Sequence, residues 1–332
     1  MAVVNEKSSN FDFLSSLTSD IGQIIADPAM QRVYEAYDKV SQSMRSYLSG
    51  QEGFLEFKPP LIGPVTDPGT RGAKQTEIEF YGKNYKFMSS GILYKQLLAI
   101  NRQKAGYPGR IYFFADNLRM EPLETANTDR HLAEFIQVDL EIVDADHFDA
   151  MEVAEGLVRN VYKDMSKHED LLKPIWSKFE DSWGPRGLTP RTEIKVPSKQ
   201  FKKYEFEEAV AILQSHIDEN PTVISEIEER FKIKVNTLRP DMELPWEYEW
   251  LLSSMHEEPF FIHDYPRGAR GFYDREYEDK KGYLMDFDLL FPHGYGEAIS
   301  GAAREYDHRK VIPRMKESGE SLGKYKWYLD FL

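Results

Sequence analysis

The densest set of polar side chains that could do chemistry lies in two neighbouring segments near the middle of the chain. Arg119 and Glu121 follow an apolar run, and the next apolar run carries Gln137, Asp139 and Glu141 at every second position. Alternate residues of a strand point to one face of a sheet, so a hairpin of the two segments would gather these side chains over one surface. Such a polar face is costly unless a ligand or partner charges satisfy it. By periodicity alone, a ligand site and a solvent-exposed face of paired charges are equally good interpretations.

Strand-like and helical runs surround these segments in an irregular order. Short apolar or alternating runs predict strands at 53–60, 76–80, 85–88, 110–117, 135–143, 259–263, 284–291 and 297–299. Apolar residues spaced by three and four predict helices at 10–49, 93–101, 146–182, 206–214 and 223–231. Most strands follow one another without strand–helix–strand alternation. This order favours an α+β fold, a mainly antiparallel sheet flanked by helices, over a Rossmann fold.

The composition is that of an ordinary globular chain with an excess of acidic residues. The 332 residues include 41% hydrophobic and 30% charged side chains, and the formal net charge is −14. Nucleic-acid binding needs basic groups that displace counterions, so this charge argues against a tRNA partner. The absence of cysteine excludes disulfides and thiolate zinc sites. No apolar run could span a bilayer and residues 1–9 lack a signal-peptide core, so no membrane association and a cytoplasmic location are expected.

The polar segments resemble motif 2 of class II aminoacyl-tRNA synthetases of the aspartyl, asparaginyl and lysyl subgroup, over residues 117–121 and 130–141. The resemblance implies that Arg119 binds the α-phosphate of ATP and the carboxylate being activated. It implies that Glu121 binds the adenine amino group and that Phe135 stacks on the adenine ring, while Arg130 and His131 meet the outer phosphates. The forked guanidinium of arginine suits phosphate oxygens, which makes the first of these roles physically sensible.

Other segments resemble the same family in the family's order. They are residues 53–60 (motif 1, which builds the homodimer interface), 89–96 (amino-acid recognition), 260–273 (the strand and loop before the metal site), and 286–290 with 294–305 (the Mg-ATP and substrate strands). The resemblance implies that Asp288 and Glu297 hold Mg²⁺ together with Ser300, and that Arg304 binds a substrate carboxylate. It therefore makes Arg119 and Arg304 the expected catalytic residues. The expected contacts to the amino acid are Ser89, Lys95, Gln137, Asp139, Arg270 and Arg304. For Arg270, a purely structural pairing with Asp264 or Asp274 is the alternative.

The position of Lys95 indicates the substrate. In the aspartyl-type enzymes that the segment resembles, a lysine here pairs with the side chain of aspartate, although a helix lysine in water is the ordinary alternative. The stretch from Gly294 to Glu305 looks more like the asparaginyl form. This mixture resembles the archaeal asparagine synthetase-related proteins and implies an AMP-forming ligase that activates aspartate with ATP and Mg²⁺ and passes it to ammonia. Ile92 stands where the family usually has a glutamine that binds the amino group, a role that Asp139 could take.

The resemblance also implies a domain organisation. Residues 1–27 would be an N-terminal extension, and residues 28–332 a class II synthetase-like catalytic domain that forms a homodimer. We find no counterpart of family motif 3, so the C-terminus looks short, and no anticodon-binding domain precedes the core. The expected partners are therefore small molecules, with tRNA disfavoured. The alternatives are an amide ligase for another amine, a paralogue of the aspartyl- or asparaginyl-tRNA synthetases, and a degenerate binding module without catalysis.

Overall fold

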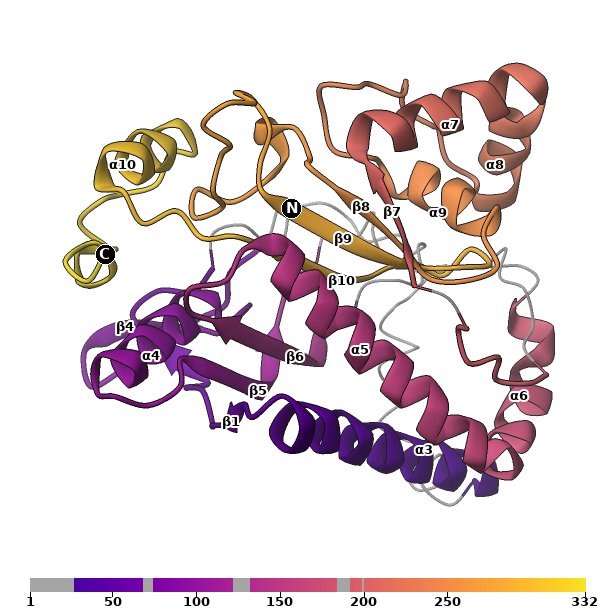
Figure 1. Cartoon of the computed structure of the whole chain (residues 1–332), viewed down its shortest axis with the longest axis horizontal. Coiled ribbons are helices and arrows are strands. Elements are labelled where there is room, and N and C mark those ends of the chain that lie inside the picture. Colours follow the sequence, from indigo (N-terminus) through magenta and orange to yellow (C-terminus); the bar gives the residue numbers. More distant parts are fainter. Residues whose placement is uncertain (1–26, 68–73, 122–131, 184–191, 199) are drawn as a thin grey trace, which may run out of the picture.

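The computed structural model describes residues 27–67, 74–121, 132–183, 192–198 and 200–332 (Figure 1). Helix α3 (Pro28–Arg45) continues into a π-helical turn, η1 (Ser46–Gln51). The Asp27 side chain accepts a hydrogen bond of 2.8 Å from the backbone N–H of Ala29, and Pro28 fills the first turn, where its missing N–H costs nothing. The structure thus confirms a helix with Pro28 in its first turn, while residues 10–26 of the predicted helix lie outside the described residues.

The first sheet contains the predicted polar hairpin. Its strands are β1 (Leu55–Glu56), β5 (Arg110–Leu118) and β6 (Glu134–Ile142), in the order β1-β5-β6. Strands β5 and β6 are antiparallel, with Ala115 opposite Gln137 and Phe113 opposite Asp139, while β1 is parallel to β5. Directly opposed residues of two neighbouring strands point to the same face of the sheet. The polar residues of β6 therefore lie beside the small and apolar residues of β5 on that face.

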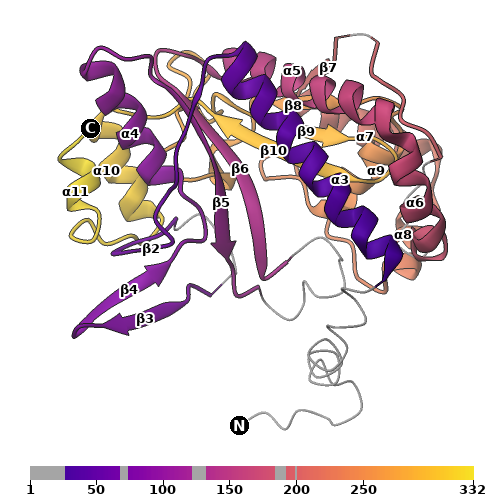
Figure 2. The same ribbon diagram turned by 90° about the horizontal axis from the view of Figure 1, so that it is seen from below.

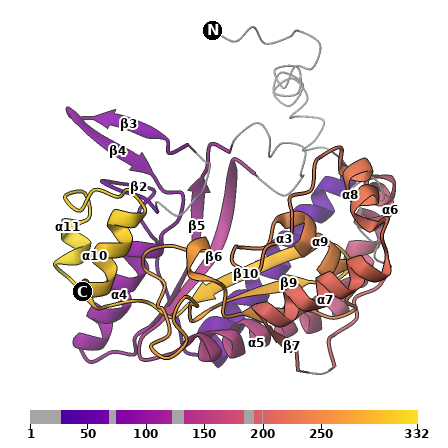
Figure 3. The same cartoon turned by 90° about the horizontal axis from the view of Figure 1, so that it is seen from above.

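The second sheet carries the predicted metal-binding strands. It has the order β10-β9-β8-β7, built from β10 (Gly296–Ala302), β9 (Asp286–Phe291), β8 (Phe260–His263) and β7 (Lys202–Glu205). Its pairs are antiparallel except for β7 with β8. A third, small sheet of β2 (Ile62–Gly63), β4 (Lys83–Phe87) and β3 (Glu77–Phe80) projects from the body of the molecule (Figures 2 and 3).

The helices cover the sheets in three groups (Figure 1). Helix α5 (His147–Met165) packs beside α3, and α6 (Glu169–Trp183) follows it after the short turn η3 (Ser166–His168). Helices α7 (Phe206–Glu219), α8 (Val223–Phe231) and α9 (Trp246–Ser254) gather at one end of the second sheet. At the other end lie α4 (Ile92–Lys104), α10 (His308–Glu317) and α11 (Lys326–Leu329) (Figure 2).

Strands β8 and β9 are buried on both faces, and their alternation decides what lies on each. Ile262 is directly opposite Asp288, and His263 is opposite Phe287, so these two pairs point to opposite faces. On one face, Ile262 packs in the core cluster of α7 and α9; on the other, Phe287 packs against Met151 of α5. We call the face with Asp288 the front face and the face with His263 the rear face.

The architecture is the predicted α+β class: antiparallel pairing dominates, and helices flank the sheets. Strands β2 and β7 and helices α9, α10 and α11 were not predicted from the sequence. Helix α9 has apolar and aromatic residues all round rather than a periodic stripe, and it is buried on most sides. Within the described ranges, no helix combines the length and the apolar character needed to cross a bilayer.

Candidate active site

A cavity of about 340 Å³ lies where the polar face of β6 meets the second sheet. Its wall includes many of the residues that the sequence analysis selected: Lys95, Arg119, Glu121, Gln137, Asp139, Arg270, Ser300 and Arg304. It also includes groups that the analysis did not select, such as Asp67, Glu243, Asp274 and Asp286. Of the two interpretations of the polar hairpin face, the cavity favours the ligand site. Arg130 and His131 lie outside the described residues.

Arg119 is held at the end of β5 by contacts on both sides. Its Nε donates a hydrogen bond of 3.0 Å to the carbonyl of Ser89, and its guanidinium lies 4.9 Å from the ring centre of Phe135. Glu121, two residues further on, lines the same cavity. Arg119 and Glu121 therefore lie together at one wall of the cavity, whereas Phe135, predicted to stack on adenine, packs against Arg119 and does not line the cavity.

Ser89 has a different place from the one predicted. It is 3% exposed, its N–H donates to the Thr66 hydroxyl at 2.7 Å, and it does not line the cavity; its neighbour Ser90 does. Through its carbonyl, Ser89 orients Arg119. Ser89 therefore does not line the cavity itself, and it contributes to the site by positioning Arg119.

Two cations on the cavity wall share one carboxylate. Lys95, with its side chain 5% exposed, forms ion pairs with Asp139 and, at 3.3 Å, with Glu141. Arg304 Nε lies 3.3 Å from Glu141, and its Nη1 lies 2.7 Å from Asp274. Burial lowers the pKa of Arg304, but attraction to Glu141 and Asp274 outweighs this effect and raises it. The sequence predicted that the ammonium of Lys95 pairs with the side-chain carboxylate of a substrate. In the structure it pairs with carboxylates of the protein itself.

A second ion-pair group lies on the front face of β9. The Arg270 guanidinium bonds Asp288, lies 3.2 Å from Asp286 and covers the Tyr265 ring at 4.2 Å. Burial raises the pKa of Asp286 well above the ordinary carboxyl value, and the charge of Arg270 offsets part of that rise. Arg270 lines the cavity as predicted. Its carboxylate partners are Asp286, Asp288 and, at 3.7 Å, Glu243, rather than the two considered from sequence.

The predicted magnesium ligands come together with a third carboxylate. Carboxylate oxygens of Glu249, Asp288 and Glu297 all lie within 4.8 Å of one another, and Ser300 is directly opposite Asp288 across β9 and β10. Asp288 Oδ1 is buried and has no hydrogen-bond partner within the described part of the chain. A set of hard oxygen donors with one buried oxygen unsatisfied fits Mg²⁺. Sequence reasoning missed Glu249, whose only signal is an acidic residue inside the aromatic helix start Trp246-Glu247-Tyr248-Glu249-Trp250.

The chain matches a family model described as tRNA synthetases class II (D, K and N) over residues 17–332. Two similar relatives are asparagine–tRNA ligases. The ligase of Koribacter versatilis is 28% identical over 84% of this chain and 56% of its own length, and that of Pyrococcus abyssi is 26% identical over 92% and 61%. The crystal structure of asparaginyl-tRNA synthetase from Pyrococcus horikoshii complexed with asparaginyl-adenylate is 26% identical, with a TM-score of 0.73, over 98% of this chain and 64% of that chain. The chain thus spans less than two thirds of the length of these relatives.

The expectation that tRNA is an unlikely partner is wrong. The relatives are tRNA ligases by name, and they match this chain over most of its length. The net charge of −14 does not exclude tRNA, because net charge is a global sum, whereas binding depends on the local surface.

Proposed function

Because the chain belongs to the class II tRNA synthetases of the D, K and N group, we propose that it uses ATP to activate asparagine or aspartate as an acyl-adenylate. One observation carries the proposal: Arg119 and Glu121 share a single cavity with Ser300, which lies directly opposite Asp288 of the carboxylate triad. A phosphate-binding guanidinium beside a set of hard oxygen donors is what adenylate formation requires.

In the proposed reaction, a carboxylate oxygen of the amino acid attacks the α-phosphorus and pyrophosphate leaves. The fork of Arg119, fixed by Ser89 and the Phe135 ring, neutralises the charge that develops on the α-phosphate. Glu249, Asp288 and Glu297 would hold Mg²⁺, which screens phosphate charge when bound. Catalysis would come mainly from positioning and charge stabilisation.

The charges around the amino-acid pocket favour asparagine as the first candidate substrate. The network beside Ile92 joins two cations to three carboxylates, a formal charge of −1, through Lys95, Arg304, Asp139, Glu141 and Asp274. A side-chain amide adds no charge and offers both a donor and an acceptor to such a mixed network. A side-chain carboxylate would add a further negative charge. The relatives are also named for asparagine.

A second candidate is the aspartate–ammonia ligase expected from the sequence, and the buried Lys95 favours it. A substrate carboxylate that replaced Asp139 at Lys95 would release Asp139 to bind the substrate ammonium. Ammonia would then attack the acyl carbon of the adenylate, AMP would leave, and the nitrogen would lose a proton to give the amide.

For either candidate function, we infer that residues 28–332 act as one catalytic domain, preceded by an extension of residues 1–27, and assemble as a homodimer.

ATP–pyrophosphate exchange with single amino acids tests both candidates. Exchange with asparagine in strong preference to aspartate supports the first. Aspartate-dependent exchange, with release of asparagine when ammonia is added, supports the second. Attachment of the labelled amino acid to tRNA transcripts tests the acceptor named for the relatives. No exchange with any amino acid would overturn both candidates and favour a binding module, and sedimentation of the purified chain tests the dimer.

A further inference from the structure

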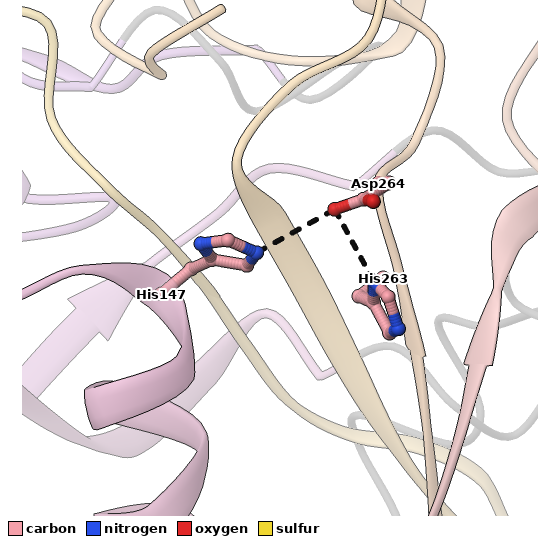
Figure 4. A group of neighbouring side chains, drawn as sticks. All are labelled: His147, His263 and Asp264. Atoms are coloured by element: carbon pink, nitrogen blue, oxygen red, sulfur yellow. Dashed lines mark ion pairs between the residues drawn. The ribbon is translucent and has the colours of Figure 1, made fainter. Parts of the chain in front are cut away.

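A second group of possible metal ligands lies on the rear face of β8, away from the cavity. We call His147, His263, Asp264 and Tyr277 the rear cluster. His147 is the first residue of α5, and His263 ends β8, next to Asp264 (Figure 4). His147 is 1% exposed, Asp264 7% and His263 9%. His263 shares its face with Phe287, whereas Asp288 points to the front face, so the rear cluster and the magnesium triad lie on opposite sides of the sheet.

The donor atoms have the spacing of a metal coordination shell. His147 Nε2 lies 3.5 Å from Asp264 Oδ1, and His263 Nδ1 lies 3.2 Å from the same oxygen. All three atoms lie within 4.8 Å of one another. A tetrahedral zinc site with bonds of about 2.0–2.1 Å has ligand-to-ligand edges of about 3.3–3.4 Å. The two nitrogen-to-oxygen distances to Asp264 Oδ1, 3.5 and 3.2 Å, lie just above and just below that range.

One of these donors is unsatisfied without an ion. His263 Nδ1 is buried and makes no hydrogen bond to any described residue, although Asp264 Oδ1 is only 3.2 Å away. A buried imidazole nitrogen without a partner costs free energy, and a shared cation between nitrogen and oxygen would remove that cost. Asp264 also has a left-handed backbone, with φ of 62°, which a non-glycine residue adopts at a cost. Both features lower the stability of the fold, and both would be compensated by an ion bound between these atoms.

We propose that the rear cluster binds a divalent transition-metal ion of the zinc class, through His147 Nε2, His263 Nδ1 and Asp264 Oδ1. Two imidazoles with one carboxylate suit such ions, whereas Mg²⁺ and Ca²⁺ take oxygen ligands. The Tyr277 hydroxyl donates a hydrogen bond of 2.8 Å to Asp264 Oδ1 and orients that carboxylate. Lys280 lies 3.8 Å from the other oxygen, Oδ2, and balances part of its charge. Water takes the fourth ligand position.

The bound ion would join the start of α5 to the end of β8 behind the active site. Asp264 N–H donates to the Asp286 carbonyl at 3.1 Å, and Tyr265 N–H donates to Asp286 Oδ1 at 2.8 Å. Asp286 is also the cavity-lining carboxylate that pairs with Arg270. The ion thus has a structural role, and it stiffens the strand ends that carry the front-face carboxylates. This proposal does not depend on the substrate or the acceptor of the reaction.

Metal binding to the full chain, stripped with a chelator, tests the proposal without any activity assay. We expect one Zn²⁺ per chain by calorimetry, the visible absorption of tetrahedral Co²⁺ when cobalt is supplied instead, and a melting temperature that rises with zinc concentration. Mg²⁺ alone should not block the cobalt signal, because it belongs to the front-face oxygens. Absence of the tetrahedral cobalt spectrum in the unaltered chain would overturn the proposal.

Variants then assign the ligands. His263→Ala and Asp264→Asn should each weaken zinc binding by at least about 10-fold, because loss of a ligand exceeds the loss of an outer hydrogen bond. The matched control is His216→Ala, a partly exposed histidine in the last turn of α7, which should bind zinc as the parent does. Glu249→Gln, on the front face, should also keep the cobalt spectrum. Zinc affinity unchanged in folded His263→Ala and Asp264→Asn would place the ion elsewhere and overturn the assignment.

Discussion

The two faces of β8 and β9 both carry buried carboxylates, yet they hold them in different ways. On the front face, Asp286 lines the cavity, and Asp286 and Asp288 both pair with the long side chain of Arg270. On the rear face, Asp264 is enclosed by two imidazoles and a tyrosine. Burial raises the pKa of Asp286, whereas the neighbours of Asp264 outweigh burial and hold its pKa far below the ordinary value.

This contrast separates chemistry from stability. Front-face and cavity groups have partners that a ligand can replace, so changing them should alter the reaction more than the fold. Rear-face groups have partners fixed by the protein, so changing them should alter stability and metal binding more than the reaction.

The largest effect is expected for Arg119→Ala on the cavity wall. Pyrophosphate exchange should fall about 10²- to 10³-fold, because one preorganised group that stabilises the transition state is removed. The melting temperature should change little. Arg119→Lys should recover only part of the rate, since an ammonium lacks the forked geometry. Arg239→Ala, an exposed arginine paired with Asp241, is the control and should leave exchange unchanged.

The next effect tests Glu249, the carboxylate that the sequence did not reveal. Glu249→Gln should lower the rate of pyrophosphate exchange about 10- to 100-fold at limiting Mg²⁺. This is the size of effect typical of removing a group that helps to hold a metal ion. Higher Mg²⁺ should restore part of the rate, because the charge lost is one of three. Titration of exchange against Mg²⁺ measures this. A fall in rate that no Mg²⁺ concentration relieves would contradict the assignment, and Glu229→Gln on the exposed side of α8 provides the control.

A smaller effect, on selectivity, is expected at Glu141. Glu141→Gln removes the carboxylate shared by Lys95 and Arg304, so the pocket becomes more positive. The ratio of kcat/KM for aspartate to that for asparagine should rise about 10-fold, which corresponds to about 1.4 kcal/mol. Kinetics with both amino acids measure the ratio. Glu134→Gln, at the exposed start of the same strand, should leave it unchanged; an equal rise there would show a general charge effect.

The smallest effect is expected on the rear face. Tyr277→Phe removes the hydroxyl that donates to Asp264 and should lower the free energy of unfolding by about 1 kcal/mol. Pyrophosphate exchange should remain at the parental rate when the protein is folded. Denaturant unfolding and exchange on the same samples measure both. Tyr81→Phe, at a tyrosine 89% exposed, is the matched control. A large loss of exchange in Tyr277→Phe would break the division between the two faces.

Features that depend on local periodicity could be predicted from the sequence. The two apolar runs and the alternation of Gln137, Asp139 and Glu141 were enough to predict the β5–β6 hairpin and its polar face. The resemblance of their segments to a known family pointed to Arg119, Asp288 and Ser300, which the structure also brings to the site. These features lie within one hairpin or one strand pair, where the two-residue repeat fixes which face each side chain takes.

Contacts between side chains of different elements could not be predicted, because they depend on how the elements pack. Glu249 comes from an aromatic helix with no periodic stripe, so its side chain could not be assigned to the metal site before α9 was packed on the sheet. Glu141 forms ion pairs with both Lys95 and Arg304 because α4, β6 and the end of β10 converge. His147 and His263 are far apart in the chain and meet only because α5 crosses the rear face of β8. Contacts of this kind arise from the packing of whole elements, which no repeat within a single segment records.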